Sequence, residues 1–262
     1  MPVPRAEPKR ILVTGASSGI GAALAELYAA PQRIIVISGR DASRLESIAQ
    51  RIEARGATAI VWPADLRDIN QFLKQLAIHD ERYCFDTAIL NAGIGAARAN
   101  ASAFEDPEQI VAMTDVNFRA PAAAATFLAT RMSSRGNGTI GLVSSFAAFV
   151  PLPMAAGYTG SKAGLAAFGR SLDASLRPRG VTVTVICPAF VDTPMSRQLS
   201  CWKPFMISAD RAAAAIMQAL LKRRRELVFP APYATLARLL PWLPNRIAVG
   251  VLSRIPFKSY RD

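Results

Sequence analysis

The amino-acid sequence predicts an α/β fold, a single doubly wound domain whose mostly parallel, seven-stranded sheet has helices on both faces. Three observations support this prediction. Short apolar runs alternate with longer helical stretches along the chain of 262 residues. A glycine-rich turn directly follows the first apolar run. No internal repeat or long linker divides the chain.

The apolar runs indicate the strands, because buried parallel strands carry nearly continuous apolar sequence. We expect strands at residues 10–14, 33–38, 57–62, 85–90, 138–143, 181–187 and 226–229. The intervening helices are expected near residues 20–30, 41–55, 68–79, 105–134, 157–178 and 208–224. In such a sheet, ligands bind beyond the carboxyl ends of the strands.

The stretch from Gly15 to Gly21 lies between the first strand and a helix. A turn of this kind points backbone amides and the positive end of a helix dipole at an anion. It predicts a Rossmann-type phosphate site lined by Gly15, Ser17, Ser18, Gly19, Ile20 and Gly21. Its spacing departs from Gly-x-Gly-x-x-Gly, and no P-loop Gly-Lys-Ser/Thr follows. The alternative is an ordinary glycine-rich turn.

Tyr158 and Lys162 lie four residues apart, so a helix would place them on one face. An ammonium beside a phenol lowers the pKa of the phenol towards neutrality and makes it a proton donor and acceptor. The alternative is a surface pair on a helix. Ser145 follows a strand, where its hydroxyl could bind a substrate oxygen. Ser144 is expected to bond the local backbone instead.

Several short motifs occur in order along the chain. They are Thr14–Gly21, Asp65-Leu66, Asn91-Ala92-Gly93, Asn117, Ser144-Ser145, Tyr158-x-x-x-Lys162 and Cys187–Thr193. Over residues 10 to 193 this set resembles the short-chain dehydrogenase/reductase family. The resemblance implies hydride transfer between a nicotinamide cofactor and a carbonyl or secondary alcohol. It also implies a homo-oligomer, either a dimer or a tetramer.

The resemblance implies roles for individual residues. Tyr158 would be the general acid/base, Ser145 would orient the substrate oxygen, and Asn117 would hold a water in a proton relay. Lys162 would acidify Tyr158 and bind the nicotinamide ribose. The other implied cofactor contacts are Asp65 and Leu66 at the adenine, Asn91, Ala92 and Gly93 along the floor, and Pro188, Val191 and Thr193 beside the nicotinamide. Ala189 replaces the family's usual glycine after Pro188, which would tighten the backbone there.

The second strand is followed by Arg40, where NAD enzymes carry an acidic residue that binds the ribose 2′-hydroxyl. A guanidinium can clamp a 2′-phosphate through its planar fork, and Ser17 could add a hydrogen bond. This predicts NADP(H) as the cofactor. The alternative is that Arg40 only begins a surface helix.

The composition of the chain bears on its cellular location and on whether it holds a metal site or a hydrolase triad. The chain has three cysteines and no Cys-x-x-Cys pair, which suits a reducing, cytoplasmic location. The N-terminus lacks the apolar core of a signal peptide. The one histidine, His79, lies among charged residues and is expected at the surface. We therefore expect no metal and no Ser-His-Asp triad.

Residues 222–262 hold nine Lys/Arg and two acids, a large share of the net charge of +12. We expect residues 1–225 to form the NADP-binding and catalytic part. Residues 226–262 would add a strand and a basic, apolar helical extension of the same domain, split at Pro241–Pro244. This extension would close the pocket or pack on a second subunit. The alternative is a peripheral membrane contact through 231–258. No nucleic-acid motif accompanies the charge.

The segment after Pro188 should shape the substrate pocket. It contains Met195, Leu199, Cys201, Trp202, Phe205 and Met206, and the stretch after Ser145 adds Phe146, Phe149, Leu152 and Met154. These side chains favour a small hydrophobic carbonyl or alcohol substrate. The alternative functions are a catalytically silent NADP-binding protein and a binding protein associated with the membrane surface.

Overall fold

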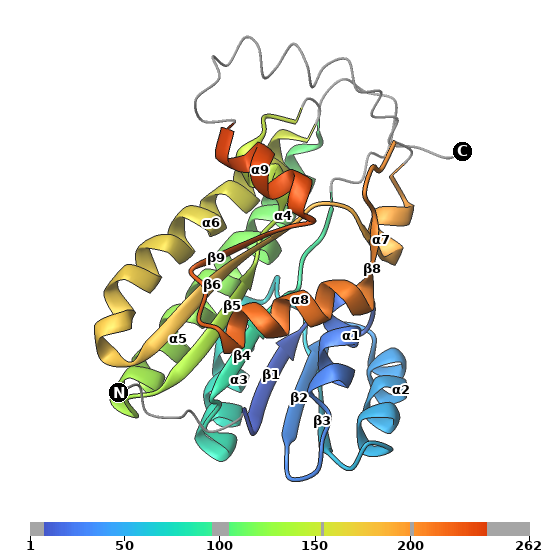
Figure 1. The fold of residues 1–262 in the computed structure, drawn as a ribbon. Helices are drawn as coiled ribbons and strands as arrows, with labels where there is room; N and C mark the ends of the chain where they lie inside the picture. Colours follow the sequence, from blue (N-terminus) through green and yellow to red (C-terminus); the bar gives the residue numbers. More distant parts are fainter. Residues whose placement is uncertain (1–7, 96–104, 153–154, 200–201, 240–262) are drawn as a thin grey trace.

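The computed structural model describes residues 8–95, 105–152, 155–199 and 202–239. Its main sheet has seven parallel strands in the order β3-β2-β1-β4-β5-β6-β9 (Figure 1). The strands are β1 (Arg10–Thr14), β2 (Ile34–Gly39), β3 (Thr58–Pro63), β4 (Thr87–Leu90), β5 (Gly138–Val143), β6 (Val181–Pro188) and β9 (Glu226–Phe229). The predicted doubly wound parallel sheet is therefore confirmed.

The strands form where the sequence is apolar or β-branched, because both faces of the sheet are covered. All residues of β5 and β6 are buried. In register, β1 lies between β2 and β4, with Thr14 opposite Ser38 on one side and Leu90 on the other. The carboxyl ends of these central strands therefore meet at one edge.

Two hydrophobic clusters lie on the two faces of the sheet. On one face, Leu24, Leu45 and Ile216 come from α1 (Gly19–Tyr28), α2 (Ala42–Glu53) and α8 (Ala209–Leu221). The other face is covered by α3 (Ile69–Tyr83), α5 (Ala120–Ser134) and α6 (Ala156–Leu176), which bury Phe72, Leu128 and Leu165. The alternation of β1 side chains explains the division: Ile11 and Val13 face the first cluster, and Leu12 faces the second.

The helical stretch predicted over 105–134 is interrupted. It consists of α4 (Pro107–Thr114), a π-helical turn η1 (Asp115–Arg119) and α5. The sequence analysis also missed the short elements that follow β6. These are β7 (Val191–Asp192), α7 (Pro194–Arg197) and β8 (Ile207–Ser208), where β7 and β8 form a second small sheet. They lie beside the carboxyl edge of the main sheet (Figure 1).

The prediction that His79 is a surface side chain is wrong in one respect. The ring is about half buried, with its centroid 4.7 Å from that of Trp62 and 6.1 Å from that of Tyr83. Burial lowers the pKa of His79, because it penalises the charged imidazole.

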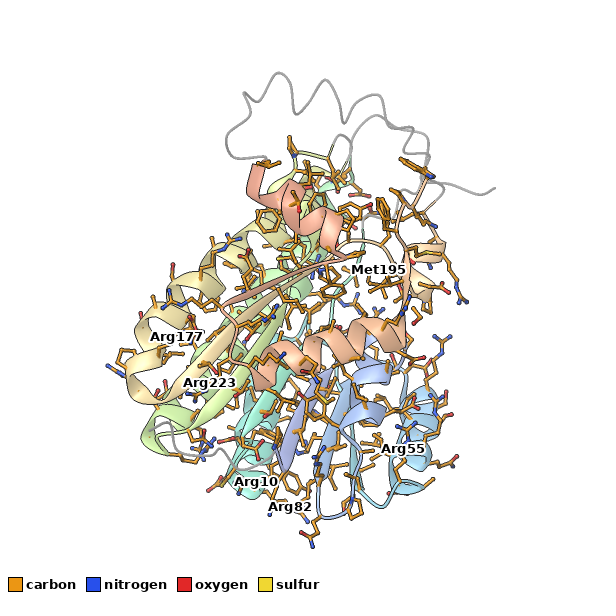
Figure 2. The ribbon with its side chains drawn as sticks, viewed as in Figure 1. Arg10, Arg55, Arg82, Arg177, Met195 and Arg223 are labelled. Carbon is orange, nitrogen blue, oxygen red and sulfur yellow. The ribbon has the colours of Figure 1, made fainter. Side chains whose placement is uncertain are left out.

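The first basic residues of the C-terminal region contact the segments around β6. Arg223 donates to the Gly180 carbonyl (2.9 Å), its own carbonyl accepts from Arg177 (2.9 Å), and Arg225 lies 3.6 Å from Asp173. In Figure 2, Arg177 and Arg223 lie near each other on the left side of the view, and Met195 lies to the right of the centre. Arg223 and Arg225 therefore contact residues at the end of α6 and just before β6.

Within the described part of the tail, α9 (Ala231–Leu239) follows β9. The second helix predicted after Pro241 lies outside the described residues. None of the helices in the described part of the chain is long and apolar enough to cross a membrane.

Helix α6 packs so closely on the sheet that Gly169 has no room for a side chain. A Cβ there would lie 2.7 Å from Val185 Cγ2 and 2.9 Å from Leu142 Cδ1, whereas nothing lies within 4 Å of a Cβ at Gly160 in the same helix. We expect Gly169→Ala to lower the free energy of unfolding by about 1–3 kcal/mol. Gly160→Ala should raise it by up to about 1 kcal/mol, because alanine favours the helix. Urea denaturation of both variants measures this, and equal effects would contradict the described packing.

Candidate functional site

The glycine loop joins β1 to α1 with a backbone that needs glycine. Gly15 and Gly19 have φ angles of +66° and +57°, in the region that favours glycine. A Cβ on Gly21 would lie 2.2 Å from the Gly15 carbonyl oxygen. The loop is thus tight, and it leads into the N-terminus of α1, where free amides and the helix dipole favour an anion. Ser18 is the N-cap residue of α1, and Ser17 and Ile20 are partly buried beside it.

Thr14 and Asn91 fasten this loop to the end of β4. The Thr14 hydroxyl accepts hydrogen bonds from the backbone N–H of Asn91 (3.0 Å) and of Ala92 (3.1 Å). The Asn91 side chain donates to the carbonyls of Thr14 (3.0 Å) and Gly15 (3.2 Å). Asn91 was predicted as part of the cofactor floor. Thr14 was not predicted as a site residue. Its position at the end of β1, next to the glycine turn, could have indicated that it belongs to the site.

Ser17 lies close to the end of β2, where Arg40 follows Gly39. A Cβ on Gly39 would be 3.4 Å from the Ser17 hydroxyl. The Arg40 side chain is exposed. The structure therefore places Ser17 near the chain position that precedes Arg40, the other residue that the sequence analysis selected for a 2′-phosphate.

Asp65 and Leu66 follow the neighbouring strand β3. Leu66 is buried, whereas the Asp65 carboxylate accepts hydrogen bonds from Arg67 Nε, the shorter at 2.9 Å. Arg67 is the main cause of a lowered Asp65 pKa, and Arg40 adds a smaller electrostatic contribution. The sequence analysis missed Arg67, which now appears as the partner that orients Asp65.

Tyr158 lies in the first turn of α6 and is half buried. Its hydroxyl interacts with that of Ser145, which follows β5 and also accepts from the Ala147 N–H (3.1 Å). One turn further along, buried Lys162 donates to the Val143 carbonyl (3.0 Å). The predicted trio of Ser145, Tyr158 and Lys162 is therefore brought together.

Ser144, expected to bond the local backbone, instead donates to the carbonyl of Lys162 (2.7 Å). This bond ties the end of β5 to α6. It helps to explain why Lys162 stays beneath the edge of the sheet.

The prediction that Lys162 lowers the pKa of Tyr158 is wrong. Burial raises the Tyr158 pKa, and the hydrogen bond with Ser145 only opposes that rise. Lys162 contributes little, because its Nζ lies 6.0 Å from the centre of the ring and bonds a carbonyl. Burial also lowers the pKa of Lys162 from 10.5 to about 8. Both shifts have the same cause, the cost of a charge removed from water.

Asn117 lies in the π-helical turn η1 and is fully buried. Its side chain accepts from the Ile94 N–H (2.9 Å) and donates to the Ile94 carbonyl (3.0 Å) and to Ser161 (3.2 Å). A Cβ on Gly93 would lie 3.1 Å from both Asn117 Oδ1 and Lys162 Nζ. Gly93, Asn117 and Lys162 therefore converge at one point. Ser161 joins them and was not predicted.

The segment after β6 passes close to the glycine loop. A Cβ on Gly19 would be 2.9 Å from Thr193 Cγ2. Thr193 also forms a capping box at the start of α7, where its hydroxyl accepts from the Ser196 N–H (3.2 Å). Val191 is buried in β7, and Pro188 ends β6. Ala189, the departure from the family pattern, donates its N–H to the Phe229 carbonyl (2.9 Å).

Aromatic side chains from three other segments gather around Tyr233 of α9. The ring of Phe146 lies 4.8 Å from it, and those of Phe190 and Phe205 lie 6.2 Å and 6.4 Å away. The Tyr233 hydroxyl donates to the Pro204 carbonyl (3.1 Å). Phe146 directly follows Ser145, so this aromatic group stands next to the predicted catalytic serine. Phe190 and Tyr233 were missed, because their proximity depends on the fold.

The other predicted pocket residues vary in placement. Trp202, Phe205 and Met206 are exposed, with 71%, 63% and 48% of their surfaces accessible, and Met195 is exposed at α7. Leu152 and Leu199 are partly buried, and Phe149 packs against Phe146. Met154 and Cys201 lie outside the described residues.

Comparisons with known proteins agree on one family. The family model described as short chain dehydrogenase matches residues 9–204. A fatty acyl-CoA reductase from Acinetobacter baylyi is 30% identical over 84% of this chain and 75% of its own length. Two solved structures, each 25% identical, cover nearly the whole of both chains. They are a short-chain dehydrogenase from Sphingobium yanoikuyae in complex with NADPH (TM-score 0.78; 97% of this chain, 99% of that one) and a bulky-bulky ketone specific alcohol dehydrogenase from Comamonas testosteroni (TM-score 0.77; 98% and 97%).

The lowered pKa of Lys162 predicts a pH-dependent effect on stability. Because the folded pKa of about 8 lies below the ordinary 10.5, the folded chain binds fewer protons than the unfolded chain between these values. The penalty for burying the charge is therefore complete below about pH 8 and is relieved as the pH rises to 10.5. The wild type should therefore gain up to about 3 kcal/mol of unfolding free energy as the pH rises from about 8 to 10.5, whereas Lys162→Met should lack this gain. The unfolding free energy of Lys162→Met minus that of the wild type is expected to fall by the same amount over this range. Urea denaturation at a series of pH values measures this, and a constant difference would contradict it.

Proposed function

The chain belongs to the short-chain dehydrogenase family, and from that premise we propose that it is an NADP(H)-dependent oxidoreductase. It would interconvert the carbonyl and alcohol forms of a lipophilic substrate. The observation that carries this proposal is the placement of Ser145, Tyr158 and Lys162. All three lie at the same edge of the sheet as the glycine loop.

The residues at this edge fit a dinucleotide phosphate. The glycines of the tight loop leave no side chain at Gly15, Gly19 or Gly21 between the backbone and a pyrophosphate at the N-terminus of α1. Arg40 and Ser17 offer a guanidinium and a hydroxyl to a 2′-phosphate, and no acidic residue stands at that position to repel it. Asp65 and Leu66 would hold the adenine. Gly93, Asn91 and Thr193 would hold the nicotinamide end. Ala92, Pro188 and Val191 would line the rest.

When bound there, the nicotinamide supplies or accepts a hydride. The chain itself handles the proton. In reduction, Tyr158 donates its phenolic proton to the substrate oxygen, and Ser145 donates a hydrogen bond to the same oxygen. The pKa of Tyr158 lies above neutrality, so the phenol carries the proton that this direction requires, but the rise in pKa makes it a weaker acid. Lys162, with a pKa near 8, keeps a positive charge beneath the site at neutral pH. Asn117 would orient that end of the site through Ile94 and Ser161.

Two findings support a lipophilic substrate. The first is the aromatic group of Phe146, Phe190, Phe205 and Tyr233 beside Ser145. The second is that two similar proteins are named for a fatty acyl-CoA and for bulky ketones. The retention of both Tyr158 and Lys162 argues against a catalytically silent nucleotide-binding protein.

We also infer that residues 226–239 belong to the same domain and line the pocket. The strand β9 pairs with β6, and Tyr233 of α9 contacts Phe146 and Pro204. Of the three roles expected for the tail (closure of the pocket, packing on a second subunit and peripheral membrane contact), these contacts favour closure of the pocket for α9.

Replacement of Tyr158 tests the proposed chemistry. We expect Tyr158→Phe to lower the rate of NADPH oxidation by about 10²–10⁴-fold across a panel of hydrophobic aldehydes and ketones, because the proton donor is lost. NADPH affinity, measured by calorimetry, should change less than about twofold, since the ring is retained. Tyr83→Phe, in α3 and remote from the site, serves as the control. A Tyr158→Phe enzyme with undiminished turnover would refute the proposal.

Replacement of Arg40 tests the choice of nucleotide. We expect Arg40→Ala to lower kcat/KM for NADPH by roughly 10–100-fold, the loss of a charge-assisted contact with a phosphate, and to leave kcat/KM for NADH nearly unchanged. Arg44→Ala is the matched control, because Arg44 lies in the first turn of α2, shortly after Arg40, and pairs with Asp41 at 3.0 Å. Equal losses with NADPH and NADH would show that Arg40 does not read the 2′-phosphate.

A further inference from the structure

The helix that carries Tyr158 is capped from a distant part of the chain. The N-cap residue of α6, Ala155, has no side chain that could accept a hydrogen bond. The backbone N–H of Gly157 instead donates to Glu105 Oε2 at 2.7 Å. Glu105 lies 52 residues earlier, just before α4. This bond therefore fixes the first turn of α6 relative to α4.

The charge of Glu105 suits this position. The first amides of a helix lack intrahelical acceptors, and the aligned peptide dipoles make that end positive. A carboxylate that accepts from such an amide forms a charge-assisted bond, about twice as strong as a neutral one. The helix α6 has 21 residues, and Glu105 provides the acceptor that its own N-cap residue lacks.

The contact is also closely packed. A Cβ on Gly157 would lie 3.0 Å from both Ile110 Cγ1 and Met113 Cε, and 3.5 Å from the second oxygen of Glu105, Oε1. That oxygen is buried, and no residue in the described part of the chain forms a hydrogen bond with it. Among the described residues, the side chain of Glu105 is therefore held by its bond to Gly157 and by packing.

The residue after Gly157 is Tyr158. We propose that Glu105 is a positioning residue for the reaction: through the Gly157 N–H it fixes the first turn of α6 and thereby holds the Tyr158 phenol beside Ser145. This inference rests on the proposed function, since it requires Tyr158 to be the proton donor. Loss of the bond would let the first turn loosen, and a displacement of a catalytic group by about 1 Å can lower a rate by about 10²-fold.

The test compares turnover in three variants of the full chain. Glu105→Ala should lower kcat for carbonyl reduction about tenfold and leave KM for NADPH within about twofold, because the proposed phosphate and adenine contacts come from other elements and Lys162 lies beyond the first turn of α6. Glu105→Gln should recover at least about a third of the rate, since an amide oxygen can accept the same bond. The matched control is Asp106→Ala. Asp106 caps α4 itself by accepting from the Glu108 N–H (2.9 Å), so its loss should lower Tm without changing kcat.

Unchanged kcat in Glu105→Ala, or an equal loss of kcat in Glu105→Ala and Asp106→Ala, would overturn the proposal. A loss of kcat that Glu105→Gln fails to recover would also overturn it. If Glu105→Ala does not fold, Glu105→Asp replaces it. A carboxylate shortened by one methylene cannot reach Gly157 in the present packing, so the same loss of kcat, about tenfold, is expected. Tyr158→Phe, measured in parallel, separates the proposed function from the positioning role of Glu105. If Tyr158→Phe turns over normally, the proposed function fails. If Tyr158→Phe is inactive and Glu105→Ala is fully active, only the positioning role is refuted.

Discussion

The contact between the ends of β1 and β4 underlies the rest of the site. Thr14 accepts from two backbone amides after β4, and the Asn91 amide returns two bonds to the carbonyls at the start of the glycine loop. These four bonds join segments separated by more than 70 residues. They place the loop that ends at α1 and the segment that leads to Gly93 against each other. Because buried backbone groups are costly to leave unpaired, this arrangement is closely specified.

From Gly93 the same network reaches the chemical groups. A side chain at Gly93 would crowd the Asn117 side chain and the Lys162 ammonium, since a Cβ there would lie 3.1 Å from each. Asn117 reaches this point from a π-helical turn, an element found frequently at functional sites. Lys162 reaches it from α6, which Ser144 and the Val143 carbonyl hold against β5. The glycine loop and the polar groups are thus parts of one connected structure.

Burial shapes the electrostatics of this region more than charge pairing does. It raises the pKa of Tyr158 and lowers that of Lys162, so both shifts disfavour the ionised form. The phenol of Tyr158 is therefore protonated near neutral pH, as a proton donor in carbonyl reduction must be. The rise in its pKa also makes it a weaker acid than the spacing of Tyr158 and Lys162 suggested.

The sequence by itself determined the order of strands and helices along the chain, the glycine turn and the family. These properties depend on local composition, on the spacing of apolar residues and on the steric needs of single positions such as Gly15. It also indicated Ser17, Arg40 and the group of Ser145, Tyr158 and Lys162, because each follows a recognisable strand or occupies a helical spacing. Only the tertiary structure decided the direction of the Tyr158 pKa, the π-helical turn at Asn117, and the contacts of Thr14, Glu105 and Tyr233. Each of these depends on burial or on partners far away in the chain, which no local pattern records.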